Sequence, residues 1–474
     1  MREQHDSTPA AATTPLPPGQ QPKGQVVSIF VDNHHPLLQL KRALDWGALT
    51  AAMVNRWRKA GKNVDGVGPG QSWPVDLYVP LLVLMGVVAL NSRQMEKHLE
   101  ENAVARLFLG IEDQLEPHVR DHSNIQRAFD ALGVEGWQEI NELVVGQAKR
   151  LGFGQVRILS SDTTVQEPAI GYPNEPGILR GLAQRVYRSL VKLKVRGWPA
   201  VEDGKEQARE IFKTVKEYHL FAKGKERKDQ LLEQLVEQTE KLIEHSQEVI
   251  KQVGASAERV RQSVVVKLEQ MVEVSAVLLP QILQWLRTGV VATGKILHAG
   301  ITAARSIVKN KAGKRVEFGL KWLINRLEGG YVFGRVVEAR ADERTMPIEA
   351  LKDYKQVFGA EAAPEMSVYD RGGSTPKTIA ELKLQGVKKV GIQPRGKAKW
   401  SVAEEDQAEV RSQRGKTEGV IGTLKSRKYG FNRRQERSNE TLMAAGQRVM
   451  ACLNLNKLMK DIVGKAKKAK LATA

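Results

Sequence analysis

Apolar residues recur at helical spacing over two long stretches of the chain. The first runs from Pro36 to Phe153, where Asp121 or Ser123 is expected to cap a short helix that carries Arg127. The second runs from about Ala183 to Ile307, and its apolar positions recur near heptad spacing at Leu231, Leu235, Leu242, Val249 and Val253. The pattern predicts a helical domain at residues 26–153 and a helical bundle at residues 183–307.

Strand-like runs occupy most of the remaining sequence. QVRILSSDTTV is expected to form a strand ending at Asp162, and Gly329-Gly330 predicts a hairpin turn between two alternating runs. The next segments read as a helix (MPIEALKDYKQVFG), a short strand ending at Asp370 (EMSVYD), a helix (STPKTIAELKLQG) and a strand (KKVGIQP). The order is βββαβαβ followed by a helix. With residues 183–307 set aside as an insertion, this is the element order of the α/β ribonuclease H-like fold, a mixed sheet flanked by helices.

These patterns also predict the limits of the domains. The sheet-containing core is expected at residues 154–182 and 308–464. Residues 1–25 are rich in Pro, Thr, Gln and Ala and are expected to form a disordered arm, and residues 465–474 are expected to form a basic tail.

The charge of the chain indicates the class of its partner. Of the 474 residues, 73 are Lys or Arg and 54 are Asp or Glu, a net charge of +19. The stretch Arg371–Ala474 holds 24 basic and 9 acidic residues, so it carries 24 − 9 = +15 of that charge. Such an excess favours nucleic acid over an anionic membrane surface, although a solvated basic tail is the alternative.

The apolar runs and the single cysteine bear on the location of the protein. The longest apolar runs, which begin at Val79 and Val274, are shorter than a membrane span, so no membrane association is expected. Cys452 has no second cysteine with which to form an internal disulfide, which fits a reducing cytoplasm.

Three carboxylates are candidates for metal-dependent phosphoryl transfer. Asp162 and Asp370 are each expected to close a strand, and adjacent strand ends share a crevice in an α/β sheet. Glu418 is four residues after Arg414 and seven before Lys425, which places the three on one helix face. Carboxylates that hold two divalent ions and cations that hold phosphate are the groups that this chemistry needs, so the three carboxylates are expected to converge.

Each of these residues also has a structural interpretation. A strand-terminal Asp is more often a turn or cap residue, and an Arg, Glu, Lys helix face is usually a solvated salt-bridge face. The helix with Arg127 is about as compatible with an ordinary bundle as with a DNA groove. The order of the three carboxylates and the surrounding positive charge favour the metal site.

These residues resemble the DDE-class transposases of bacterial insertion sequences, in particular the ISNCY-type group. The similarity lies in SDTTVQEPAIGYPNEPGILR, in VYDRGG, in R-x3-E-x6-K at Arg414, Glu418 and Lys425, and in helical N-terminal segments such as DHSNIQRAFDALG. The wider signature often has Tyr where this chain has Arg411. The charge-rich segment also contains Arg433 and Arg434, which are expected to contact DNA phosphates with Arg414 and Lys425.

The resemblance implies a retroviral integrase-type catalytic core and a DNA-binding N-terminal domain. It implies that Asp162, Asp370 and Glu418 hold two Mg2+ ions, with Mn2+ able to substitute, for DNA cleavage at transposon ends and strand transfer into target DNA. The implied partners are double-stranded DNA and a second copy of the chain in the DNA complex, in a bacterial cytoplasm at the nucleoid. A nuclease or resolvase on the same fold and a non-catalytic DNA-binding protein are the alternatives.

Overall fold

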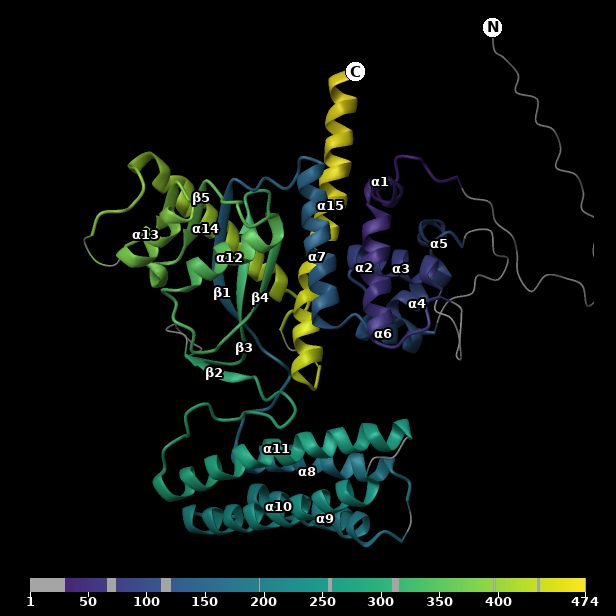
Figure 1. The fold of residues 1–474 in the computed structure, drawn as a ribbon, viewed down its shortest axis with the longest axis vertical. Helices are drawn as coiled ribbons and strands as arrows, with labels where there is room; N and C mark the ends of the chain where they lie inside the picture. Colours follow the sequence, from purple (N-terminus) through teal and green to yellow (C-terminus); the bar gives the residue numbers. More distant parts are fainter. Residues whose placement is uncertain are drawn as a thin grey trace, which may run out of the picture.

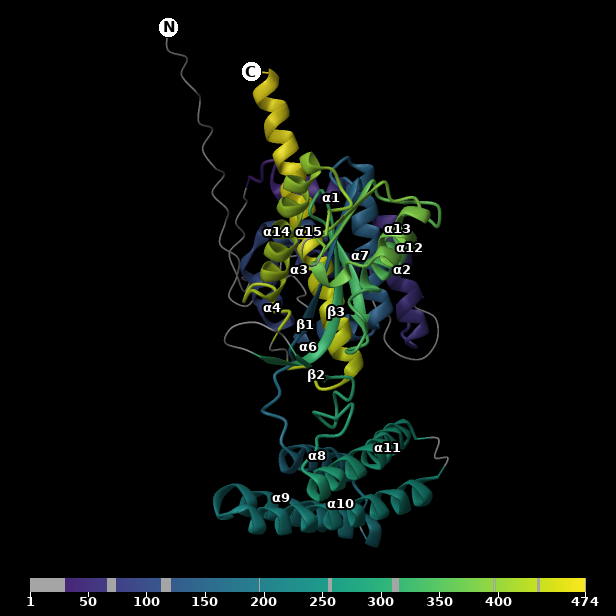
Figure 2. The same cartoon turned by 90° about the vertical axis from the view of Figure 1, so that its left-hand side faces the viewer.

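The computed structural model describes residues 30–65, 74–111, 121–195, 197–254, 258–308, 315–394, 396, 398–432 and 435–473. Within them, a mixed sheet lies between a helical N-terminal region and the covering helices, and a helical bundle extends beyond one end of the sheet (Figures 1 and 2). The predicted arm at residues 1–25 lies outside the described residues.

The N-terminal region is helical, as the apolar periodicity predicted. Side chains of Asp45, Asn91, Asn102 and Asp121 accept hydrogen bonds from the first turns of their helices, which satisfies backbone donors that a helix cannot pair. The helices are α1 (Pro36–Ala43), α2 (Trp46–Lys59), α3 (Val75–Val88), α4 (Ser92–Glu101), α5 (Ala103–Leu109), α6 (His122–Asp130) and α7 (Gly133–Arg150).

Strands far apart in the sequence pair in one mixed sheet. Its order is β2-β3-β1-β5-β6, and β4 also pairs with β3. β3 is antiparallel to its neighbours β1 and β4, whereas β5 runs parallel to β1 and β6 runs parallel to β5. The strands are β1 (Ile158–Gln166), β2 (Arg305–Val308), β3 (Val316–Leu327), β4 (Val332–Val337), β5 (Met366–Tyr369) and β6 (Lys389–Ile392).

The hairpin turn between β3 and β4 was predicted correctly. Gly330 has φ +86°, which side-chain-bearing residues rarely adopt, and a Cβ on Gly329 would lie 2.3 Å from the carbonyl oxygen of Phe153. Only glycine fits both positions. The β1 prediction was wrong in one respect, because the strand does not end at Asp162 but continues to Gln166, with β3 supplying pairing partners as far as Gln166.

Helices cover both faces of the sheet. α12 and α13 pack on one face and α14 on the other, where α14 contacts β1, β5 and β6. The short 3-10 turn η1 (Arg371–Gly373) follows β5 directly. The helices are α12 (Met346–Phe358), α13 (Pro376–Leu384), α14 (Glu404–Lys425) and α15 (Asn439–Thr473).

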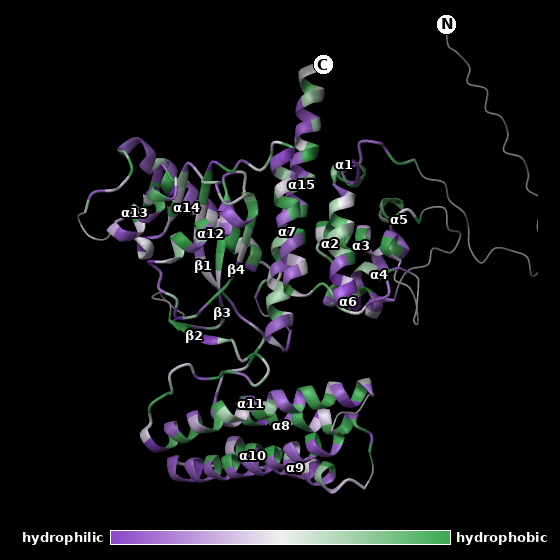
Figure 3. Ribbon diagram, in the orientation of Figure 1, coloured by the Kyte–Doolittle hydropathy of each residue, from purple (hydrophilic) through white to green (hydrophobic). Residues whose placement is uncertain are grey.

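The insertion is an amphipathic bundle with its own hydrophobic cluster, which contains the predicted heptad positions Leu235, Leu242, Val249 and Val253. Figure 3 shows hydrophobic and hydrophilic residues along each of its helices. It begins at Glu175 rather than at residue 183, because the apolar face of its first helix packs into that cluster. Its helices are α8 (Glu175–Lys192), α9 (Pro199–Leu220), α10 (Lys225–Val253) and α11 (Arg259–Thr288).

The N-terminal helices do not form a domain with a separate core. α7 packs along α15, and one continuous hydrophobic cluster joins them to the sheet. Buried Asn141 of α7 and Asn454 of α15 both donate to the carbonyl oxygen of Val332, at 3.0 and 2.6 Å, and thereby cover the edge strand β4. The predicted tail at 465–474 is instead helical as far as Thr473, as the end of α15.

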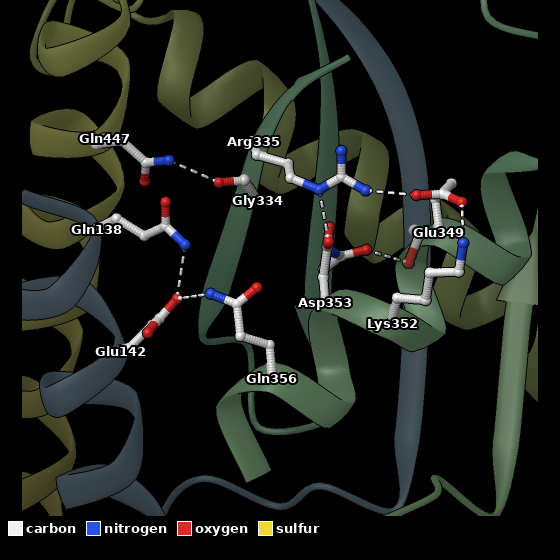
Figure 4. A network of polar contacts seen from close by, with 11 residues as sticks. Gln138, Glu142, Gly334, Arg335, Glu349, Lys352, Asp353, Gln356 and Gln447 are labelled. Carbon is white, nitrogen blue, oxygen red and sulfur yellow. Dashed lines mark hydrogen bonds and ion pairs between the residues drawn. The ribbon is translucent and has the colours of Figure 1, made fainter. Parts of the chain in front are cut away.

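A polar network ties β4 to the helices on either side (Figure 4). Arg335 of β4 donates to Asp353 and Glu349 of α12, both at 2.7 Å, and Gln447 of α15 donates to the carbonyl oxygen of Gly334 at 2.8 Å. The network continues inward, because buried Asn325 of β3 donates to Asp353 at 3.0 Å and accepts from Ser161 of β1 at 2.7 Å. These contacts fix β1 against β3 at Ser161, the residue next to Asp162.

No single helix among the described residues is both long and apolar enough to cross a membrane; α3 and α4 pass that test only as a pair bent by 99°.

The network gives a stability prediction. Asn325→Ala should lower the free energy of unfolding by about 2–3 kcal/mol, because it leaves the Ser161 hydroxyl and one Asp353 oxygen without their buried partner. Gln262→Ala, at an exposed position of α11, is the control and should change it by less than about 0.5 kcal/mol. Urea unfolding of both variants measures the difference, and equal stabilities would contradict the assigned role of Asn325.

Candidate active site

Asp162 and Asp370 occupy matching positions on adjacent parallel strands. The pairing of β1 with β5 places Ile158, Leu159 and Ser160 opposite Met366, Ser367 and Val368, an offset of 208 residues. The same offset takes Asp162 to Asp370 (370 − 162 = 208), and Asp370 keeps an extended backbone at φ −71°, ψ 168°. Adjacent strands lie about 4.8 Å apart, so the two aspartates are neighbours across the strand pair.

Both aspartates belong to the face of the sheet that α14 covers. Ser160, two residues before Asp162, accepts a 2.7 Å hydrogen bond from the Thr417 hydroxyl of α14. Val368, two residues before Asp370, packs in a cluster with Val410 of α14. Side chains two residues apart on an extended strand share a face, so Asp162 and Asp370 are directed to the α14 side.

Each aspartate carboxylate accepts a hydrogen bond from a nearby backbone N–H group. Asp162 is half-buried, whereas all the other residues of β1 are buried. Its Oδ1 accepts from the backbone N–H of Thr163 at 2.7 Å. The Asp370 carboxylate accepts from the backbone N–H of Gly372 in η1. Asp370 is therefore the N-cap of η1, which agrees with the structural alternative given for a strand-terminal Asp. The same hydrogen bond fixes the position of its carboxylate.

Glu418 lies on α14, the helix that covers this face. It follows Thr417, which contacts Ser160, and lies on the edge of the helix stripe that packs on the sheet. Its side chain is 64% exposed, and one carboxylate oxygen lies 3.7 Å from Nη2 of Arg414. α14 begins with acidic residues and ends with Lys425, which is the favourable orientation for the helix dipole.

The structure places Asp162 and Asp370 on the face of the sheet that α14 covers and Glu418 on α14 itself, but the predicted convergence of the three carboxylates into a compact cluster is not seen among the described residues. Among the described residues, the ligand atoms that all lie within 4.8 Å of one another belong to a different group, Glu96, Asp121 and His122.

That other group is explained by local structure. Asp121 caps α6 by accepting from the backbone N–H of Ser123, and Nδ1 of His122 lies 3.0 Å from a carboxylate oxygen of Glu96. These contacts join α6 to α4.

A fourth acid, Glu343, lies beside the aspartates and was missed by the sequence interpretation. It accepts from Tyr369 at 2.6 Å and from Thr163 at 3.1 Å, and it pairs with Nζ of Lys321 at 2.7 Å. Burial opposes its ionisation, but the hydrogen bonds from Lys321 and Tyr369 prevail and lower its pKa. Glu343 follows β4 in a loop, where no periodicity or motif distinguishes it.

Three acids act on the buried phenol of Tyr369. Burial raises its pKa, and the charges of Glu343, Asp162 and Asp370 raise it further. The phenol therefore stays protonated and donates to Glu343. Tyr369, the last residue of β5, therefore lies within range of the charges of Glu343, Asp162 and Asp370.

The predicted basic residues have different placements. Arg414 and Lys425 lie on α14 with Glu418, whereas Arg433 and Arg434 lie outside the described residues. Arg127 is exposed on α6, where it donates to Asn124 at 2.8 Å, on the other side of α7 and α15 from α14 (Figure 1). Arg411 stacks its guanidinium 5.6 Å from the ring centre of Trp400.

The comparisons with known proteins bear on the N-terminal region. Residues 25–131 match a protein family described as a transposase domain (DUF772), which supports a transposase family for this chain. The matched segment spans α1 to α6 and excludes the three carboxylates. No curated protein and no solved structure matches the chain.

The lowered pKa of Glu343 gives a pH prediction. Its folded-state pKa lies below the ordinary value of 4.5, so its ionised form stabilises the fold above that pH and this contribution disappears as the pH falls through the folded-state pKa. Glu343→Gln should therefore lower the free energy of unfolding at neutral pH and approach wild type in acid. Exposed Glu361→Gln is the control. Urea unfolding across pH measures the difference, and a pH-independent difference would contradict the assignment.

Proposed function

We propose that the chain is a DDE-class transposase of the ISNCY type with a ribonuclease H-like core, in which Asp162, Asp370 and Glu418 carry out metal-dependent DNA cleavage and strand transfer. The observation that carries the proposal is the shared register of Asp162 and Asp370 on the face that α14 covers. The strand order β4-β3-β1-β5-β6, in which only β3 runs antiparallel to the other strands, also supports the ribonuclease H-like assignment.

The donor chemistry of the site fits Mg2+. Carboxylate oxygens are hard ligands, which Mg2+ and Mn2+ prefer, and Asp162 and Asp370 come from rigid, adjacent backbone positions. These two residues would hold the ions together with Glu418. When bound, two such ions activate the attacking oxygen and stabilise the leaving oxygen of a phosphodiester.

The other side chains position these groups and the DNA. Arg414 lies beside Glu418 and, with Lys425 on the same helix, is suited to hold phosphates near the carboxylates. Lys321 and Tyr369 keep Glu343 ionised and hydrogen-bonded, so its charge is balanced within the fold. We assign Glu343 to positioning the ends of β1 and β5.

Asp370→Asn and Glu418→Gln test the chemistry. Each keeps the shape of the side chain and removes a charged ligand, so nicking of a supercoiled plasmid with the native flanking DNA should fall by about 10³–10⁴-fold in Mg2+ or Mn2+. Duplex binding in EDTA should stay close to wild type, because phosphate contacts lie elsewhere. Glu404→Gln, an exposed acid in the first turn of α14, is the matched control and should retain nicking.

The products separate the alternatives. Nicking followed by joining of the 3′ end to a second DNA supports a transposase. Nicking without joining would favour a nuclease or resolvase, and binding without any metal-dependent nicking would favour a non-catalytic DNA-binding protein. Undiminished nicking in either carboxylate variant would remove the two-metal assignment.

A further inference from the structure

A groove of about 830 Å3 lies between the helical bundle and the segment that precedes α15. α8, α11 and this segment line it. Their side chains bring a cluster of cations to the groove: Arg185, Arg188, Lys192, Lys267 and Arg437. This cationic cluster lies away from Asp162, Asp370 and Glu418, which do not line the groove.

The cations of this cluster do not form ion pairs like those on α9. On α9, Lys205, Arg209 and Lys213 each pair with a glutamate three residues earlier, at 2.6–3.0 Å. None of the five cations of the cluster forms an ion pair with a carboxylate of the described residues. A solvated charged face would show the α9 pattern, so the groove requires another explanation.

The cations also crowd one another. Burial and the charges of Arg437 and Arg188 lower the pKa of Arg185, and burial and Lys192 lower the pKa of Lys267. Like charges held together without an anion are unfavourable, and a bound polyanion would relieve that repulsion.

The fold holds Arg185 in this position by a close approach. Its guanidinium donates to the carbonyl oxygen of Arg437 and lies against Gly300, where a Cβ would fall 1.6 Å from Nη2. Only glycine allows this placement. Arg185 thereby joins α8 to the segment before α15.

His298 adds a neutral donor to the groove. Its Nδ1 accepts from the backbone N–H groups of Gly300 and Ile301, at 3.1 and 3.2 Å, which places the ring proton on Nε2. Burial and the charges of Arg185 and Arg437 lower the pKa of His298 to about 4, so the ring is neutral at physiological pH. Donors and cations together suit phosphate oxygens.

We propose that this groove binds the phosphate backbone of duplex DNA, and that the bundle α8–α11 holds DNA during the reaction. A long polyanion is favoured over a small anion because the five cations come from three separate segments, α8, α11 and the residues before α15, along a groove of about 830 Å3 whose lining holds one acid, Glu436. The inference rests on the proposed DNA transaction and assigns a role to the insertion.

Salt-dependent binding tests the groove directly. Arg188→Gln, Lys192→Gln and Lys267→Gln are combined in one variant, and Lys205→Gln, Arg209→Gln and Lys213→Gln form the control with the same change in charge. Affinity for a scrambled duplex of about 30 base pairs is measured in EDTA across a salt series. The slope of log K against log salt should flatten by up to about 2.7 in the groove variant, at 0.9 per lost phosphate contact, and stay unchanged in the control. Equal slopes in the two variants would overturn the proposal.

Lysine acetylation of the wild-type chain gives a second readout that does not depend on a variant. The duplex should protect Lys192 and Lys267 and leave Lys213, whose side chain is 69% exposed, reactive; equal reactivity of Lys192 and Lys267 with and without DNA would overturn the groove. Both experiments omit divalent metal. If the groove variant shows a flattened salt slope but the wild-type chain never cleaves DNA, the groove proposal stands and the proposed chemistry is wrong. If the chain cleaves DNA but the slope is unchanged in the groove variant, only the groove proposal is wrong.

Discussion

The parallel pairing of β1 with β5 is the constraint on which the candidate site depends. It joins residues that are 208 positions apart and, by its register, places Asp162 beside Asp370. A slip of one residue would move one aspartate to the opposite face of the sheet, away from α14. The buried contacts of Ser161 with Asn325 and of Asn325 with Asp353 hold β1 from the other face. Register and chemistry are therefore set by the same backbone pairing.

Local patterns in the sequence predicted the elements, and long-range contacts decided what the patterns could not. The heptad spacing of α10 and the glycine turn after β3 are local signals, and both predictions are confirmed. The end of β1 depends on β3, which pairs with it as far as Gln166, so the prediction of a strand ending at Asp162 was wrong. The helical structure of the C-terminal residues and the shared core depend on α15 packing along α7, which no local period encodes.

At the candidate site, too, some residues could be predicted from local sequence patterns and others depend on long-range contacts. Asp162, Asp370 and Glu418 were chosen by order and strand context; the structure places the two aspartates on the face that α14 covers, and Glu418 lies on that helix. Glu343 lies in a loop and joins them only through Thr163, Lys321 and Tyr369, which come from three strands. Such a residue cannot be found before the strands are placed. The catalytic assignment itself remains a proposal.

The proposed DNA groove lies at the insertion, apart from the candidate metal site on the sheet. The insertion's own hydrophobic cluster lets it fold beside the sheet without entering the site, and its unpaired cations face the segment between α14 and α15. Under the two proposals, phosphate binding and metal chemistry use separate surfaces: five cations and a single acid, Glu436, line the groove, and the candidate carboxylates lie at the strands. Mixing them would neutralise both, because carboxylates repel phosphate and pair with the cations.

Anomalous diffraction from crystals grown with Mn2+ tests the central claim most directly. The account predicts metal peaks within coordination distance of Asp162 and Asp370, with Glu418 drawn toward them, and loss of these peaks in Asp370→Asn. Peaks only at Glu96, Asp121 and His122, or none near the two strands, would contradict it.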